Sequence, residues 1–257
     1  MKYSFVYKII ILSLLFPEFI SGQNSKGILS YKYVLNLFGV PTTQTAYLYF
    51  NDTKSVFIHS KGKEGNIMKT EDGKDWDGVT LHSKFGGWYQ DSIGCVVFKD
   101  LKNQKICVRS FFYGIAYLTE EPKLPTIKWD ILNEYLKIGN YNCQKASTRF
   151  RGRNYTAWFT KEIPVSDGPW KLQGLPGLII ESADDTGEVK YLFNSIEINS
   201  PVMIDINPPT DGKKVDFETY KKADNVEFEK YKQETELKSH ITIGRGKINL
   251  IEKEYEQ

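Results

Sequence analysis

The chain has 257 residues, of which 40% are hydrophobic, and its 34 Lys and Arg residues nearly balance 32 Asp and Glu residues. This apolar content and near-neutral charge exclude global disorder, and 20 glycines with 10 prolines are too few for a collagen-like or low-complexity chain. The balanced charge also gives no reason to expect nucleic acid as a partner.

Residues 1–22 have the pattern of a secretory signal. Lys2 and Lys8 supply positive charge before an apolar run at 9–16, and small residues precede Gln23. The alternative is an uncleaved membrane anchor, but this run is too short to span a hydrocarbon core of about 30 Å. We therefore expect a cleaved signal, a secreted or periplasmic mature protein, and no transmembrane segment once the signal is removed.

The mature chain, 23–257, has the pattern of strands from residue 27 to about residue 198. Polar and apolar side chains alternate over 30–37, and two apolar runs, 46–50 and 55–59, flank a polar hairpin link. Further strands are expected at about 79–83, 86–90, 93–99, 105–111 and 113–118. Short runs broken by turns about every 8–12 residues are typical of an antiparallel meander. We predict one mainly β domain, built on a single curved antiparallel sheet or an open barrel.

Two more hairpins and a helical C-terminal part complete the predicted elements. One hairpin joins 143–150 to 154–160, and the other joins 178–180 to 189–193. Over about 215–238 the chain is highly charged, and its aromatic residues recur at the spacing of one helical face. We predict one or two helices there that pack on the sheet; the alternative is a helix that binds a partner.

Three cysteines, Cys95, Cys107 and Cys143, enter the oxidising compartment that export implies. Cys95 and Cys107 lie in two apolar runs on either side of residue 101, so a hairpin centred there would bring them together in a disulfide. The alternative is that all three are small buried apolar residues, and the odd count leaves at least one unpaired within the chain. Because no cysteine precedes Cys95, a lipid-anchored N-terminal cysteine is excluded.

The usual catalytic motifs are missing from the sequence: it has no serine-nucleophile elbow, zinc-protease motif, phosphate loop or dinucleotide fingerprint. His59 and His82 lie in strand-like runs and would form a shared metal or base site only if they met across a sheet; a structural role is commoner. The acidic segment 71–78 resembles a calcium loop, but Gly73 replaces its first acid and Lys84 its bidentate Glu. We predict no catalytic residue, no metal and no cofactor.

The least ordinary part of the chain is 143–180, which is rich in aromatic residues, glycine and proline. Proline fixes φ, and glycine adopts conformations closed to other residues, so constrained turns there predict a rigid apolar loop. We expect Trp170 and Leu175 to fold inward and cap one end of the apolar face of the sheet. The turn residues are Gly168, Pro169, Gly174, Pro176 and Gly177.

The same part of the chain supplies the candidate ligand-binding or lid residues Trp158, Trp170, Leu175, Arg151 and Arg153. The two tryptophans would stack on a sugar or a lipid, or else close the core beneath the loop. The two arginines would grip an anion, or else lie in a solvated hairpin tip.

Residues 174–179 read Gly-Leu-Pro-Gly-Leu-Ile, and they follow Gly-Pro-Trp-Lys at 168–171 and Ala-Trp-Phe-Thr at 157–160. With these motifs the chain resembles the GLPGLI family of exported proteins from the Bacteroidota, most strongly over about 125–182. The resemblance implies an exported, β-rich protein. Because the function of that family is not established, the resemblance assigns no site residue.

Two classes of function fit these observations best. The first is a non-enzymatic binding or carrier protein that holds an apolar ligand, a lipid or a polypeptide on a curved sheet. The second is an exported hydrolase with a carboxylate-dependent or His-dependent site of unrecognised pattern. A third alternative is an envelope assembly factor that binds only other proteins.

Overall fold

The computed structural model describes residues 25–36, 41–62, 73–74, 80–81, 91–112, 114–200 and 205–220, together with 222–223, 226, 229–230 and 233. Several predictions fall outside the described residues: the signal at 1–22, His82, Lys84, and most of the acidic segment 71–78 and of the strands expected at 79–83 and 86–90.

The strands are β1 (Gly27–Leu35), β2 (Thr42–Phe50), β3 (Lys54–His59), β4 (Gly73–Lys74), β5 (Thr80–Leu81), β6 (Cys95–Asp100), β7 (Lys105–Phe112), β8 (Ile115–Glu121), β9 (Asp130–Ile138), β10 (Tyr141–Phe150), β11 (Arg153–Thr160), β12 (Leu178–Asp184), β13 (Val189–Ile198) and β14 (Lys213–Lys214). Twelve of them form one sheet in the order β14-β8-β7-β6-β3-β2-β1-β13-β12-β11-β10-β9, and β4 pairs with β5 separately.

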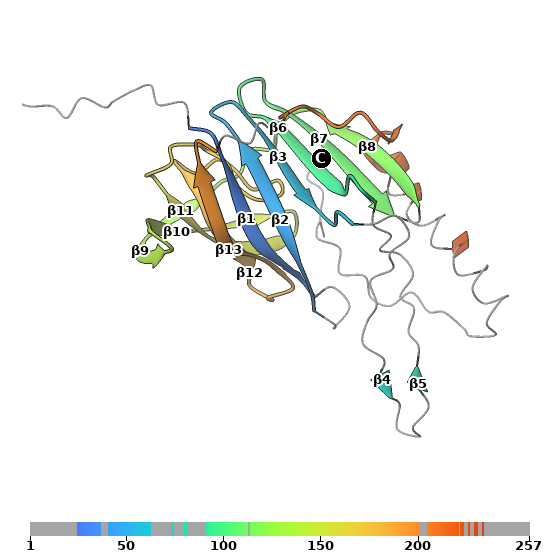
Figure 1. The fold of residues 1–257 in the computed structure, drawn as a ribbon, viewed down its shortest axis with the longest axis horizontal. Coiled ribbons are helices and arrows are strands. Elements are labelled where there is room, and N and C mark those ends of the chain that lie inside the picture. Colours follow the sequence, from blue (N-terminus) through green and yellow to red (C-terminus); the bar gives the residue numbers. More distant parts are fainter. Residues whose placement is uncertain are drawn as a thin grey trace, which may run out of the picture.

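The large sheet is antiparallel throughout, except that the short β14 runs parallel to β8. Figure 1 shows it as a strongly curved, open surface, with β6 to β8 towards one end and β9 to β11 towards the other. The prediction of a mainly β protein with a single curved antiparallel sheet is therefore confirmed. A short helix near the C-terminus begins at residue 217, within the predicted range 215–238.

The predicted hairpins are present because local side chains specify their turns. Between β2 and β3, the Asn51 Oδ1 accepts hydrogen bonds from the backbone N–H groups of Thr53 and Lys54, both at 2.9 Å. This Asx-type turn sets the pairing of Phe50 with Ser55. The pairs β10–β11 and β12–β13 follow the same antiparallel plan.

The main core lies on the inner face of the curved sheet. Along β1, the alternate residues Leu29, Tyr31, Tyr33 and Leu35 are buried in it, as the period-two pattern requires. Residues of β2, β3, β6, β7 and β10 to β13 contribute to the same cluster. The inner face of nearly the whole sheet therefore shares one apolar core.

A smaller apolar cluster occupies the opposite, outer face. It consists of Val56, Val96, Phe98 and Cys107, and Ile206 from the C-terminal part of the chain packs against it. After Ile206 the chain runs to β14, and further on the Tyr220 ring lies edge-on to Tyr117 of β8, with centroids 6.0 Å apart. The C-terminal part thus packs on the sheet, as the aromatic spacing predicted.

Candidate functional site

The segment 161–177, between β11 and β12, fills the hollow of the curved sheet, and we call it the plug. Its buried side chains, which join the main core, are Ile163, Val165, Trp170, Leu172 and Leu175. Trp170 is only 5% exposed, and its ring lies 5.8 Å from that of Phe150 and 6.4 Å from that of Tyr155. The chain's own residues therefore occupy the inner apolar face.

The turn residues of the plug bring its backbone close to the sheet. A Cβ added at Gly177, where φ is +155°, would lie 2.1 Å from the carbonyl oxygen of Thr160. At Gly168 an added Cβ would lie 2.7 Å from Cβ of Ile179. Gly168, Pro169 and Gly177 are buried, whereas Gly174 and Pro176 are exposed at the surface of the plug.

The structure does not bring Trp158 and Trp170 together. The β11 residues Tyr155, Ala157 and Phe159 are buried in the inner core, so Trp158 projects to the other face of the sheet. There the Lys145 Nζ lies 5.9 Å from the centre of the Trp158 ring. The two tryptophans therefore form no common stacking platform.

The two arginines of the candidate set are both paired with carboxylates. Arg151 Nη2 lies 2.6 Å from Glu121, whose other oxygen is 2.5 Å from Lys171 Nζ. Arg153 binds Asp184 and Glu188, with its Nη1 2.6 Å from the Glu188 oxygen. Arg151 and Arg153 are both buried, which differs from the solvated hairpin tip considered from the sequence.

Another buried cation is Lys99 of β6. Its Nζ lies 2.5 Å from an Asp167 oxygen in the plug, and both side chains are fully buried. Sequence reasoning missed this pair because Lys99 begins a polar link and Asp167 begins a turn, and neither position signals burial.

The expected disulfide between Cys95 and Cys107 is absent, and all three cysteines are free. In the β6–β7 hairpin Cys107 pairs with Phe98 and Asp100 pairs with Lys105, so the hairpin is not centred on residue 101. Cys95 is three positions from Phe98, which places it on the opposite face of the sheet from Cys107. The turn sets this register, because the Asp100 carboxylate accepts the Asn103 N–H at 2.8 Å.

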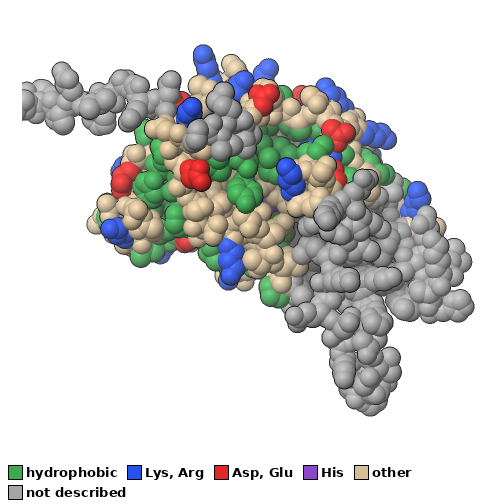
Figure 2. Space-filling model, viewed as in Figure 1, with side chains coloured by type: hydrophobic (Ala, Val, Ile, Leu, Met, Phe, Trp, Pro, Cys, Tyr) green, Lys and Arg blue, Asp and Glu red, His purple; other side chains and the backbone are tan. Residues whose placement is uncertain are grey.

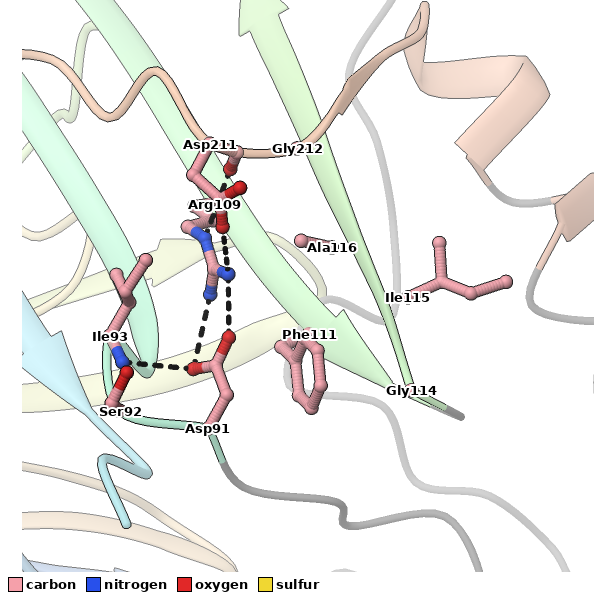
Figure 3. A pocket seen from close by; sticks show the side chains of 10 residues that line it. All are labelled: Asp91, Ser92, Ile93, Arg109, Phe111, Gly114, Ile115, Ala116, Asp211 and Gly212. Atoms are coloured by element: carbon pink, nitrogen blue, oxygen red, sulfur yellow. Dashed lines mark hydrogen bonds and ion pairs between the residues drawn. The ribbon is translucent and has the colours of Figure 1, made fainter. Parts of the chain in front are cut away.

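An open cleft of about 620 Å³ lies at the far end of the sheet, lined by Asp91, Ser92, Ile93, Arg109, Phe111, Gly114, Ile115, Ala116, Asp211 and Gly212. Figure 3 shows the Arg109 guanidinium held between the carboxylates of Asp91 and Asp211, with the Phe111 ring beside them. Arg109 Nη2 is 2.6 Å from Asp91 and 2.7 Å from Asp211, and Nη1 donates to the Gly94 carbonyl at 2.6 Å.

The charged side chains of this cleft form ion pairs with one another. Burial by itself raises the pKa of Asp91, but hydrogen bonds from Arg109 and from the Gly94 N–H outweigh it, and the pKa lies below its usual range. The guanidinium N–H groups of Arg109 donate hydrogen bonds to Asp91, Asp211 and Gly94. Arg109 therefore links these chain segments and does not present its donors to a bound anion. Its partners are distant in sequence, so no motif revealed the cleft.

His59 lies among aromatic rings at the end of β3. Its ring is edge-on to Tyr33 at 5.0 Å, and Tyr33 in turn stacks on Tyr191 with centroids 4.9 Å apart. Burial lowers the pKa of His59 to about 4, so the ring is neutral at physiological pH. Its Nδ1 is hydrogen-bonded to the Ser60 hydroxyl at 2.9 Å. His82, the proposed partner, lies outside the described residues.

The described ranges contain no group of three or more His, Cys, Asp or Glu side chains arranged to hold a metal ion. Within the same ranges, no helix is both long and apolar enough to cross a membrane.

The edge strand β9 exposes most of its side chains. It ends the sheet, with β10 as its neighbour on one side. Three of the seven large apolar side chains that the described residues expose belong to it: Ile131, Tyr135 and Leu136. Tyr135 is 66% exposed. Figure 2 shows apolar side chains at the surface on the side where Figure 1 places β9 to β11.

A family model described as a protein of unknown function (Porph_ging), a Bacteroidota-associated family, matches residues 150–181. These residues cover the end of β10, β11, the plug and the start of β12. No curated protein matches the chain.

Among solved structures, the chain is similar to PNGF-II in a P21 crystal, with a TM-score of 0.52 and 16% identity over 80% of this chain and 34% of that one. A C2 crystal of PNGF-II gives a TM-score of 0.51 and 16% identity over 79% and 33% of the two chains. The chain thus spans about a third of the length of the structures it matches, and the likeness is one of fold alone.

Proposed function

We propose that this protein is an exported, non-enzymatic binding protein that takes an extended polypeptide segment along the β9 edge of its sheet. The observation that carries the proposal is the exposure of Ile131, Tyr135 and Leu136 on a strand that ends the sheet. An edge strand presents unpaired backbone groups, and apolar side chains beside them supply contacts for the side chains of an added strand.

The regular half of β9 is the part best suited to accept such a strand. From Tyr135 to Ile138 the strand pairs in register with β10, whereas a bulge interrupts the pairing around 132–134. Tyr135 and Leu136 are neighbours in the strand, so they project to opposite faces and flank the backbone edge between them. An added strand would bury apolar surface on both faces of the sheet.

The other ligands considered from the sequence receive less support. An apolar ligand or lipid on the inner face would have to displace the plug, whose Trp170, Leu172 and Leu175 are buried there. For a hydrolase, a carboxyl group with a raised pKa would be the expected feature. Each described carboxyl group whose pKa departs from its ordinary value has it lowered: Asp91, Asp100 and Asp216. An envelope assembly factor would bind its protein partner along the same β9 edge. The identity of the bound polypeptide therefore distinguishes an assembly factor from a carrier protein.

Export is the second element of the proposal. It rests on the charged start and apolar run within 1–22, on the resemblance to the GLPGLI family and on the match to a Bacteroidota-associated family model. The mature protein, secreted or periplasmic and without a lipid anchor, should begin at or within a few residues of Gln23. N-terminal sequencing tests this, and an intact Met1 in the envelope fraction would contradict it.

The β9 edge is tested by site-specific photocrosslinking in the native cell. A photoreactive aromatic residue replaces Tyr135 in one variant and, as a matched control, Tyr47 in another, because Tyr47 is an exposed tyrosine on β2, an interior strand. The expected result is a polypeptide adduct at position 135 and none at 47. Lipid adducts alone, equal labelling at both positions or no adduct at 135 would each overturn the proposal.

Hydrogen exchange gives an independent readout of the same event. Strand addition protects backbone amides of β9 in the presence of the captured polypeptide, because they become hydrogen-bonded. Contact through side chains alone would leave their exchange unchanged.

A further inference from the structure

Lys99 and Asp167 form an ion pair from which solvent is wholly excluded. Both side chains have no exposed surface, and Nζ of Lys99 lies 2.5 Å from Oδ1 of Asp167. The pair joins β6 to the plug across the main core. Burying two charges in apolar surroundings is costly, and this cost distinguishes the pair from an ion pair at the surface.

The contacts of the two groups are unlike those of an ordinary ion pair. Lys99 Nζ donates to the carbonyl oxygens of Gly168 at 2.7 Å and Leu172 at 3.4 Å. Neither oxygen of Asp167 accepts an aligned hydrogen bond in the described part of the chain. The nitrogen thus directs N–H groups at backbone carbonyls while it sits against the carboxyl group. Burial also lowers the pKa of the Lys99 ammonium, which the charge of Asp167 only partly opposes.

We propose that Lys99 and Asp167 condense to an isopeptide bond, which joins β6 covalently to the plug. The proton moves from the ammonium to the carboxylate, and the neutral Nζ attacks Cγ of Asp167. A bond forms between Nζ and Cγ, the bond from Cγ to one carboxyl oxygen breaks, and that oxygen leaves as water with the proton of the acid and one proton of the amine. Holding the two groups in contact supplies the entropy that condensation in water lacks.

The surroundings suit the product. The amide keeps one N–H on Nζ, and the Gly168 carbonyl at 2.7 Å is placed to accept it. The step requires no metal, oxidant or cofactor, since the reaction balances with water as its only by-product. The plug would then be held to the sheet by a covalent bond as well as by its buried apolar side chains.

Two other lysine–carboxylate pairs show why Lys99 and Asp167 are distinct. Lys171 also lies 2.5 Å from Glu121, but the other oxygen of Glu121 binds the Arg151 guanidinium at 2.6 Å, so this carboxylate has a second cationic partner. Lys145 and Glu134 lie 2.8 Å apart at the surface, where water stabilises both charges.

Mass spectrometry of the purified full chain tests the proposal directly. The denatured protein should be lighter by one water molecule than the sequence of the same mature chain requires. Tryptic digestion should give residues 85–102, uncleaved at Lys99, joined to residues 162–171. Recovery of these peptides only as separate molecules, with an intact mass equal to the sequence, would overturn the proposal.

Two controls sharpen this measurement. Lys99→Arg retains the cation but removes the nucleophilic amine, so the variant should have the full sequence mass and should migrate more slowly in a denaturing gel than the cross-linked native chain. If this variant does not fold, the native mass still decides. The half-buried Lys145 should remain unlinked to the exposed Glu134; a cross-link there as well would mean that sample handling produces such bonds, and would also overturn the proposal.

Discussion

Arg109 of β7 donates to the carboxylate of Asp211 at 2.7 Å, although the two residues differ sharply in exposure. The Arg109 side chain is 1% exposed and that of Asp211 is 63% exposed. The same Nη2 nitrogen lies 2.6 Å from Asp91, just before β6. A single buried guanidinium therefore joins three distant parts of the chain, and it holds the segment that leads to β14 against the end of the sheet.

We predict that Arg109→Met lowers the free energy of unfolding by about 3–5 kcal/mol, because it leaves the Asp91 carboxylate without its buried partner. Urea unfolding followed by tryptophan fluorescence measures this change. Asp211→Asn is the control: its side chain is largely solvated, so the cost should stay within about 1 kcal/mol. Equal effects of the two substitutions would show that burial of the guanidinium does not govern this cluster.

Gly177→Ala should be among the most destabilising single substitutions in the plug. The added Cβ would meet backbone atoms of Thr160, with 2.1 Å to its carbonyl oxygen, and backbone cannot rotate away as a side chain can. We expect a loss of about 3 kcal/mol or more in the free energy of unfolding. At Gly114, where φ is +79° and an added Cβ meets nothing within 4 Å, alanine should cost only about 1 kcal/mol of backbone strain. Similar losses at the two glycines would argue against close packing of the plug.

The cysteines should all react as thiols. Burial raises the pKa of both Cys107 and Cys143 to about 11, so neither forms the reactive thiolate at neutral pH in the folded protein. We expect slow alkylation of the native chain and modification of all three cysteines after denaturation without reductant. Mass spectrometry counts the added groups, and a denatured chain that takes up only one would restore the disulfide that the sequence suggested.

The local part of this fold is predictable from sequence because short-range chemistry determines it. The Asn51 turn, the alternation along β1 and the apolar run 178–180 each depend on neighbouring residues, and each yields the expected element. The inward position of Trp170 also follows from the constrained turns around it. The order of the strands in the sheet could not be predicted in this way. β13 lies between β1 and β12, and no local sequence pattern specifies these pairings.

The candidate site was less predictable because its important contacts join distant residues. Arg109 and Asp211, or Lys99 and Asp167, stand in ordinary polar stretches, and only the tertiary structure makes them partners. The separation of Trp158 from Trp170 had a usable signal, since strand alternation already sets Trp158 opposite to its buried neighbours. The predicted disulfide between Cys95 and Cys107 was wrong because it assumed the wrong pairing register for the β6–β7 hairpin. A shift of the turn along a hairpin changes which residues face each other.

The stability of the protein should fall between about pH 6.5 and pH 4 because of His59. Burial lowers the pKa of this ring from 6.5 to about 4, so over this interval the unfolded state binds more protons than the folded state. The free energy of unfolding should therefore decrease as the pH falls, by about 1.4 kcal/mol per pH unit and about 3 kcal/mol in total, and this contribution is fully present above pH 6.5.

Urea titrations at several pH values measure the slope. His59→Gln, which can retain a hydrogen bond to Ser60 but does not titrate, should flatten the curve by this amount. Parallel curves for the two proteins would mean that His59 is not held neutral by burial.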